Sequence, residues 1–324
     1  MATSSYAFAV GNVRARETAL LKKQDIFQLL SFKTPAEAVG FLRDKGFGYP
    51  DTPDGDLFKA EEQKLWEYIR EVAPDFSVFY GFILQNDCHN IKSVLKCMSL
   101  GREYKELILS PYTIDPDKLY RAVSERKFSE LDETVAEGVK KASDALLKIG
   151  DPQLADATLD ALFMELRLNS AEKLKLSMLE TIIKTSVFYD NIKAAIRSAR
   201  AKKSMDFCEA CLIDTPELSK KDLISAVLKG ADEVLTLLEK SSALGAAEAA
   251  AAYKRSPSEF EKTVDDLIMS EVVKAKYIAV GAEPLIAYLQ ARLCEIKVAR
   301  IVVNGITIGE GEEKVREMLR ELYG

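Results

Sequence analysis

The sequence predicts an all-α protein, and three observations lead to that prediction. The chain has only 16 glycines and 10 prolines in 324 residues, fewer than average usage would give. Alanine, leucine, glutamate and lysine are frequent, and these residues favour long helices. Apolar residues recur at helical spacing along most of the chain, and glycine or proline interrupts that spacing at only a few places.

The expected helices can be followed in chain order from their start signals. Thr34 before Pro35 and Asp115 before Pro116 each place a capping side chain ahead of a proline at the first helical position. Ser219 precedes Asp222 by three residues, an acidic variant of the capping box. Amphipathic stripes follow at 91–98, 174–183 and 285–293, and breaks are expected at 46–50, 150–152 and 256–257.

The C-terminal part departs from the helical pattern. Residues 301–309 (IVVNGITIG) are β-branched and contain glycine, so we expect a short extended piece there. A helical pattern then runs from Glu312 to Leu322. The glycines before it do not match a phosphate-binding loop, because neither G-x-x-x-x-G-K-[ST] nor G-x-G-x-x-G occurs. We interpret them as a turn that enters the last helix.

Composition argues against several classes of protein. A net charge of −6 disfavours a dedicated nucleic-acid binder and a polybasic membrane-surface anchor. No window holds eighteen consecutive apolar residues, and the N-terminus lacks the pattern of a secretory signal. Five cysteines without such a signal indicate reduced thiols in a cytosol.

Internal repeats are visible when the sequence is shifted against itself. A shift of 104 places residues 119–123 over 223–227 and Ile192-Lys193 over Ile296-Lys297. A shift of 101 places Asn90-Ile91-Lys92 over Asn191-Ile192-Lys193. We predict three helical repeats, at 1–113, 114–217 and 218–324, arranged around one centre.

Signatures of catalysis are scarce. His89 is the single histidine, which excludes a paired-histidine metal motif, and we favour a structural, hydrogen-bonded role over that of a general base. Cys208 and Cys211 form a lone C-x-x-C, interpreted as free thiols on a helix. Neighbouring acids such as Asp265 and Asp266 point apart on a helix. We expect no catalytic residue, cofactor or metal.

A basic run follows the second Asn-Ile-Lys element. Its members are Arg197, Arg200, Lys202 and Lys203. They either form the solvated end of a helix or contact an acidic partner.

Three stretches carry a resemblance to a known family. They are residues 6–17 followed by Leu20-Leu21, the element Asn86–Lys92 with its N-D-x-H-N-[IL] pattern, and residues 284–288 followed by Glu295-Ile296-Lys297 and Arg300. In this order and at this chain length they resemble the C subunit of V/A-type ATPases, which is called d in eukaryotes. One departure lies after Val303, where Asn304-Gly305 lacks the lysine that relatives often carry.

The resemblance implies a specific architecture and role. It implies three similar helical units around a pseudo-threefold axis, forming a funnel-shaped socket. The socket would rest on the proteolipid ring, receive the shaft made of the D and F subunits, and pass torque without hydrolysing ATP itself. The protein would lie in the cytoplasm, peripheral to the inner (plasma) membrane through the ring and not inserted, with no nucleic-acid partner.

The signature residues are expected to act structurally. Ile91, Ile192 and Ile296 should face the cores, while Asn90, Asn191 and Glu295 should hydrogen-bond to hold neighbouring helices in register. The full set is Asp87, His89, Asn90, Lys92, Asn191, Lys193, Glu295, Lys297 and Arg300. Two alternatives stay open: a generic helical scaffold or adaptor, and an enzyme with an unrecognised carboxylate site, which would show a polar pocket with perturbed acids.

Overall fold

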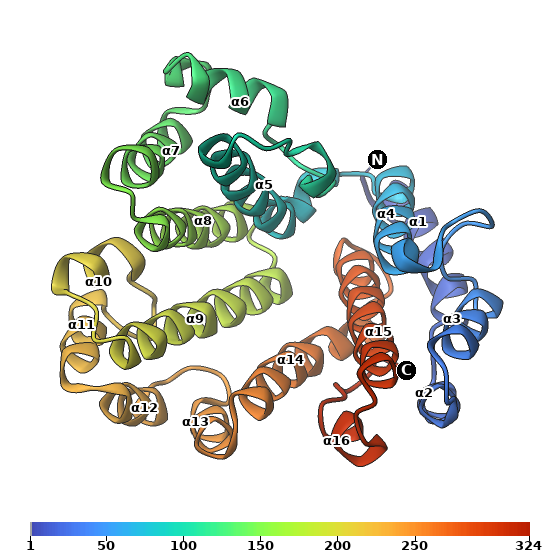
Figure 1. Cartoon of the computed structure of the whole chain (residues 1–324). Coiled ribbons are helices and arrows are strands. Elements are labelled where there is room, and N and C mark those ends of the chain that lie inside the picture. Colours follow the sequence, from blue (N-terminus) through green and yellow to red (C-terminus); the bar gives the residue numbers. More distant parts are fainter. Residues whose placement is uncertain (1) are drawn as a thin grey trace. The chain divides into compact units, whose positions relative to one another are not determined.

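The computed structural model describes residues 2–324, with side chains from Tyr6 onward, and this part of the chain contains helices, turns and loops but no strand (Figure 1). The all-α prediction is confirmed. The chain forms two compact units, Phe79–Ala250 and the pair of segments Met1–Val78 and Ala251–Gly324. The three repeat boundaries and their threefold arrangement stay a prediction. Within residues 2–324, no helix is both long and apolar enough to cross a membrane.

The unit formed by residues 79–250 is built around one long helix, α8 (Pro152–Leu174). This helix packs against α5, α7, α9 and α10, and α9 in turn contacts α11 and α12. The core of this unit includes Ile91, Leu119 and Phe163, and each of these side chains is at most 2% exposed. The other helices are α5 (Tyr80–Leu100), α6 (Pro116–Ser124), α7 (Glu133–Asp144), α9 (Ser177–Arg200), α10 (Met205–Cys211), α11 (Lys220–Lys229) and α12 (Ala231–Lys240).

The other unit is centred on α15 (Glu283–Ile308), the longest helix described. It packs against α1, α2, α3, α4, α14 and α16, so helices from both ends of the chain share one core. Their bounds are α1 (Ala2–Glu17), α2 (Lys23–Ser31), α3 (Pro35–Asp44), α4 (Leu57–Val72), α14 (Pro257–Val273) and α16 (Glu312–Glu317). Helix α13 (Ala246–Arg255) lies where the chain passes from one unit to the other.

The predicted helix starts are present as hydrogen-bonded caps. The side chains of Thr34, Asp115 and Ser219 accept backbone N–H groups at 3.3, 2.7 and 3.1 Å. These bonds satisfy donors that a helix N-terminus leaves without a partner. The predicted breaks at 46–50, 150–152 and 256–257 also fall at helix boundaries, with Pro152 and Pro257 as the first residues of α8 and α14. The stripe at 174–183 is split, because Lys175 takes a left-handed conformation between α8 and α9.

The expected extended piece at 301–309 is wrong, because α15 continues to Ile308. Packing overrides the β-branched composition here: Val302 is fully buried, and a Cβ on Gly305 would lie 2.5 Å from Val315 Cγ2. Gly305 therefore serves close helix contact and not a turn. The last helix is shorter than expected, ending at Glu317. The residues after it pack without helical structure, with Arg320 ion-paired to Asp265 at 2.8 Å.

Candidate functional site: helix-to-loop clamps and a buried ion-pair cluster

The polar residues of the Asn86–Lys92 element bind the loop that follows their own helix. Asp87, on α5, is fully buried and accepts hydrogen bonds from the Thr113 hydroxyl at 2.6 Å and the Thr113 N–H at 2.9 Å. Asn86 donates to the Pro111 carbonyl at 2.9 Å. Burial raises the pKa of Asp87 above its usual 3.8, although these bonds favour the charged form. The element therefore fixes the connection from α5 to α6.

Asn90 makes the most complete of these contacts. Its amide donates to the Leu109 carbonyl at 2.9 Å and accepts the Leu109 N–H at 2.8 Å. We call this arrangement, in which one side chain satisfies both backbone groups of a single loop residue, a clamp. Asn90 is 1% exposed, and it gives both backbone groups of the half-buried Leu109 a partner.

His89 lies on the exposed side of the same helix. Its Nε2 is 3.0 Å from the Leu107 carbonyl oxygen and 3.3 Å from Ser93 Oγ. The ring thus extends the set of contacts to the loop, which agrees with the structural role that we favoured.

The second Asn-Ile-Lys element forms the same clamp. On α9, Asn191 donates to the Ile213 carbonyl at 2.9 Å and accepts the Ile213 N–H at 3.2 Å. Asn191 is 1% exposed. The spacing is also similar, since Leu109 follows Asn90 by 19 residues and Ile213 follows Asn191 by 22. Both asparagines thus hydrogen-bond to a loop that follows their helix, whereas the predicted role of holding neighbouring helices in register stays a prediction.

The third element uses a segment from the other end of the chain. Glu295, on α15, accepts the N–H of Leu21, which lies between α1 and α2. Residues 19 to 22 positions after Glu295 belong to α16 and make no such contact with it in the structure described. At the third element the backbone partner thus comes from the N-terminal segment and not from the residues that follow. The isoleucines behave alike in all three, because Ile91, Ile192 and Ile296 are at most 1% exposed, as predicted.

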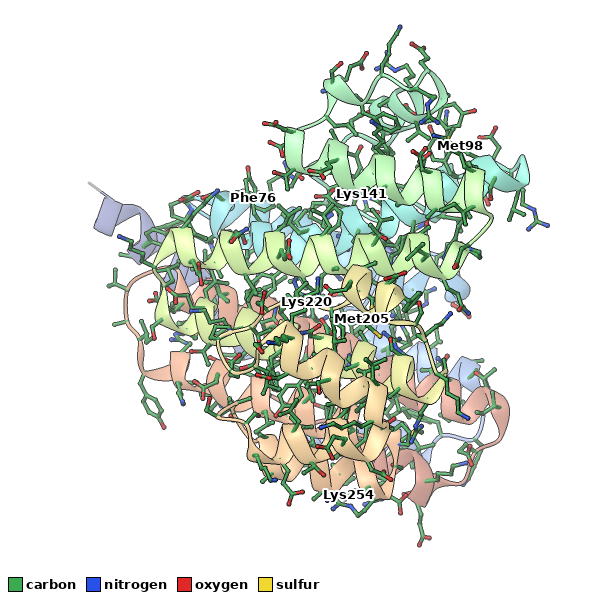
Figure 2. All side chains as sticks on the ribbon, turned by 90° about the vertical axis from the view of Figure 1, so that its left-hand side faces the viewer. Phe76, Met98, Lys141, Met205, Lys220 and Lys254 are labelled. Carbon is green, nitrogen blue, oxygen red and sulfur yellow. The ribbon has the colours of Figure 1, made fainter. Side chains whose placement is uncertain are left out.

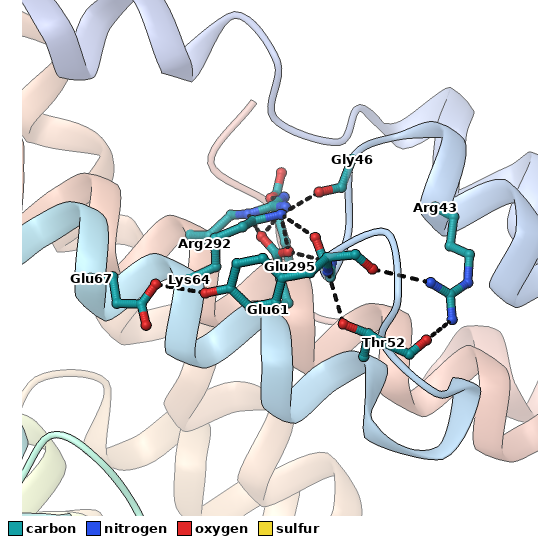
Figure 3. Close-up of polar contacts among 10 residues, drawn as sticks. Arg43, Gly46, Thr52, Glu61, Lys64, Glu67, Arg292 and Glu295 are labelled. Carbon is teal, nitrogen blue, oxygen red and sulfur yellow. Dashed lines mark hydrogen bonds and ion pairs between the residues drawn. The ribbon is translucent and has the colours of Figure 1, made fainter.

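Glu295 also belongs to a buried ion-pair cluster with Arg292 and Glu61 (Figure 3). The Arg292 guanidinium lies 2.6 Å from Glu61 Oε1 and 2.5 Å from Glu295 Oε2. Glu61, on α4, also pairs with Lys64 at 2.6 Å and accepts the Gly48 N–H at 2.7 Å. The cluster connects α15 to α4 and to the loop before α4 that contains Gly48.

Burial dominates the electrostatics of this cluster. It raises the pKa of Glu295 from 4.5 to about 7, although the Arg292 charge and the Leu21 N–H favour the carboxylate. For Arg292, burial alone would lower the pKa, but the two carboxylates reverse this effect and raise it. No signal in the sequence pointed to Glu61 or Arg292, because charged residues on an amphipathic helix are normally solvated.

The remaining signature residues form ion pairs between helices or along one helix. Lys92 pairs with Asp160 at 2.5 Å, and Lys297 pairs with Asp265 at 2.5 Å. Lys193 pairs with Asp190 on its own helix at 2.9 Å. Arg300 reaches Glu62 on α4 at 2.6 Å. Asp265 thus pairs with Lys297 of α15, while the neighbouring Asp266 pairs with Lys262 of its own helix at 2.5 Å.

A polar cavity of about 460 Å³ lies between α5, α8, α9 and α10. Its carboxylates are already paired, Asp160 with Lys92 and Asp156 with Lys96 at 2.7 Å. Arg197 and Lys203 of the basic run also line it, as does Cys211. Both thiols of the C-x-x-C are free and buried on α10, as predicted. Glu295, the acid with the pKa near 7, belongs to the other unit and is not among the residues that line this cavity.

No group of three or more histidine, cysteine or acidic side chains in the described residues could hold a metal ion. The side chains that the sequence singled out are instead bonded to backbone groups or to opposite charges. This arrangement holds helices and loops in fixed positions.

Comparison with known proteins agrees with the resemblance in sequence. Residues 9–318 match the family model described as ATP synthase (C/AC39) subunit. The chain is 23% identical over 323 residues to the C subunit of the V-type sodium ATPase of Enterococcus hirae, covering 96% of this chain and 97% of that protein. The chain therefore belongs to the V-type ATPase family of C/AC39 subunits.

Proposed function

We propose that this chain is the non-catalytic central-stalk subunit of a rotary V/A-type ATPase. It would couple the proteolipid ring of the membrane sector to a shaft of the D and F subunits and transmit torque for ion transport or ATP synthesis. The observation that carries the proposal is the match to the family and to the C subunit of a V-type sodium ATPase over nearly the whole of both chains.

The internal construction suits a part that carries torque. Torque transmission needs stiff elements, and tightly packed helices deform little. Helices α5, α8, α9 and α15 are 21 to 26 residues long. Polar side chains of α5, α9 and α15 bind backbone groups of Leu109, Ile213 and Leu21. A force applied to a loop would therefore pass directly to a long helix.

The surface suits contact with a ring of identical subunits. Charged residues make up 30% of the chain. Charged side chains can adapt to several copies of one polar loop more readily than a close-fitting apolar surface can.

Reconstitution with the other subunits tests the proposal. The full chain is mixed with the D–F shaft and, separately, with detergent-solubilised proteolipid ring, and complexes are detected by size-exclusion chromatography. We expect the chain to co-elute with each. We also expect that omitting it from reconstituted vesicles abolishes ATP-driven ion uptake, while the catalytic head still hydrolyses ATP.

Two results would favour other functions. Failure to bind both shaft and ring would favour a generic helical scaffold or adaptor. ATP hydrolysis or another turnover by the isolated chain, lost on substitution of a single acid, would favour an enzyme.

A further inference from the structure

A groove of about 730 Å³ runs along the face of the 79–250 unit where α8 lies between α7 and α10. Figure 2 shows this face, with Lys141 on α7 on one side of α8 and with Met205 and Lys220 on the other. On α8 the lining positions are 154, 158, 161, 162 and 165, and on α7 they include 134, 137, 138 and 141. Both sets have the spacing of a single helix face, so two helix faces converge on one open space.

The floor of the groove is apolar. It is formed by Leu154, Ala161 and Leu162 of α8 and by Ala210 of α10, all of which are partly exposed. At its edge, Ile149 is 70% exposed. Exposed apolar surface that is contiguous and bordered by charge is typical of a site that binds another protein.

The rim of the groove is acidic. Its lining residues include five carboxylates and two lysines, and one of the carboxylates, Asp144, pairs with Arg126 at 2.9 Å and Lys148 at 3.0 Å, which lie outside the lining. Lys141 pairs with Glu137 at 2.7 Å, and Lys220 pairs with Glu209 at 3.2 Å. Among the described residues, Glu165 of α8 and Asp206 of α10 have neither an ion pair nor a side-chain hydrogen bond. The groove thus keeps negative charge that its own lysines do not neutralise.

From the groove's shape and charge we infer that it binds an amphipathic helix of a partner protein, one that carries an apolar stripe flanked by lysine or arginine. The apolar stripe would cover Ala161 and Leu162, and the basic residues would pair with Glu165 and Asp206. Helix-in-groove binding uses this combination of an apolar face and complementary charge. The inference goes beyond the proposed function and does not depend on it.

A peptide-binding experiment tests the inference with the full chain. The probe is a labelled 15-residue helical peptide of leucine and lysine with leucine at i, i+3, i+4 and i+7, and binding is measured by fluorescence anisotropy. The matched peptide has glutamate in place of lysine. We expect binding of the lysine peptide, weakening as salt is added, and no binding of the glutamate peptide.

Paired variants separate the groove from the overall negative charge. Glu165→Gln with Asp206→Asn should weaken binding of the lysine peptide about fivefold, the size expected for the loss of two rim charges. The control is Glu103→Gln with Asp232→Asn, which removes the same charge from two exposed acids outside the groove. Asp232 matches Asp206 because each lies in the first turn of its helix. The control should change affinity less than about twofold.

Filling the groove gives an independent test. Ala161→Phe should occupy the floor and weaken binding about tenfold or more without changing the net charge, and circular dichroism verifies that the variant is folded. Equal weakening by the control pair, equal binding of the glutamate peptide, or no effect of Ala161→Phe would overturn the inference. So would a concentration-dependent dimer that Ala161→Phe abolishes, since the occupant would then be a second copy of this chain.

Discussion

Substitution of Glu295 by glutamine should remove a pH dependence of stability that this one carboxyl creates. The pKa of Glu295 is about 7 in the folded chain, and its usual value of 4.5 applies in the unfolded chain. Between these pH values the folded chain keeps a proton that the unfolded chain has released. The stabilisation is therefore fully present below about pH 4.5 and is lost as the pH rises through about 7.

The magnitude follows from the difference between the two pKa values. One pKa unit corresponds to about 1.4 kcal/mol, so the change is worth about 3 kcal/mol of unfolding free energy. The groups that face the carboxyl are Arg292, Glu61 and the Leu21 N–H. Glutamine cannot ionise, so the Glu295→Gln chain should lack this loss. Relative to that variant, the wild type should become less stable by about 3 kcal/mol between about pH 4.5 and 8.

The assay can follow the unit that contains Glu295. Trp66 is the single tryptophan of the chain and lies buried on α4, the helix that also carries Glu61. Its fluorescence in urea reports the unfolding of this unit at each pH. A Glu62→Gln chain, which breaks the more exposed pair with Arg300, serves as control and should shift stability by less than about 1 kcal/mol at every pH.

One result would refute the reasoning about Glu295. If the stability difference between wild type and Glu295→Gln stayed constant from about pH 5 to 8, the carboxyl would not change its charge in that range. Burial would then not control its ionisation.

Three further substitutions test the packing and the clamps. Ile192→Ala should lower the free energy of unfolding by about 2 to 5 kcal/mol, because Ile192 is fully buried; a change below about 1 kcal/mol in urea denaturation would contradict its place in the core. Asn191→Ala should lower the free energy of unfolding by about 2 to 4 kcal/mol, because both backbone groups of Ile213 lose their partner. Amide hydrogen exchange should then become faster in the loop at 212–218, and unchanged exchange would disprove the clamp. Gly305→Ala should lower the free energy of unfolding by about 1 to 3 kcal/mol, because the new Cβ overlaps Val315. Adding Val315→Ala should recover part of this loss in a thermal melt, whereas purely additive losses would argue against the contact.

The two Asn-Ile-Lys elements and the related element Glu295-Ile296-Lys297 show which contacts the similar sequences share. All three isoleucines are buried, and the first two elements make the same clamp. At the third, glutamate replaces asparagine and binds a backbone N–H only. A carboxylate accepts hydrogen bonds but donates none when ionised, which accounts for its single bond to Leu21 and its pairing with Arg292.

Local signals in the sequence were sufficient to determine much of this protein. Helical periodicity determined the class, and the caps Thr34, Asp115 and Ser219 determined the starts of α3, α6 and α11, because these features depend on residues a few positions apart. The Asn86–Lys92 element identified the family, since its pattern is specific and lies in one short segment. Burial of Ile91, Ile192 and Ile296 followed from their register.

Contacts between distant segments were decided only by the tertiary structure. The pairing of Glu61 with Arg292 joins residues 231 positions apart, and Leu21 reaches Glu295 across 274 positions. No local pattern contains such pairs. Residues 301–308 are helical for a similar reason: their β-branched composition favours a strand, but burial of Val302 and the close approach of Val315 to Gly305 exist only in the folded chain and outweigh that preference.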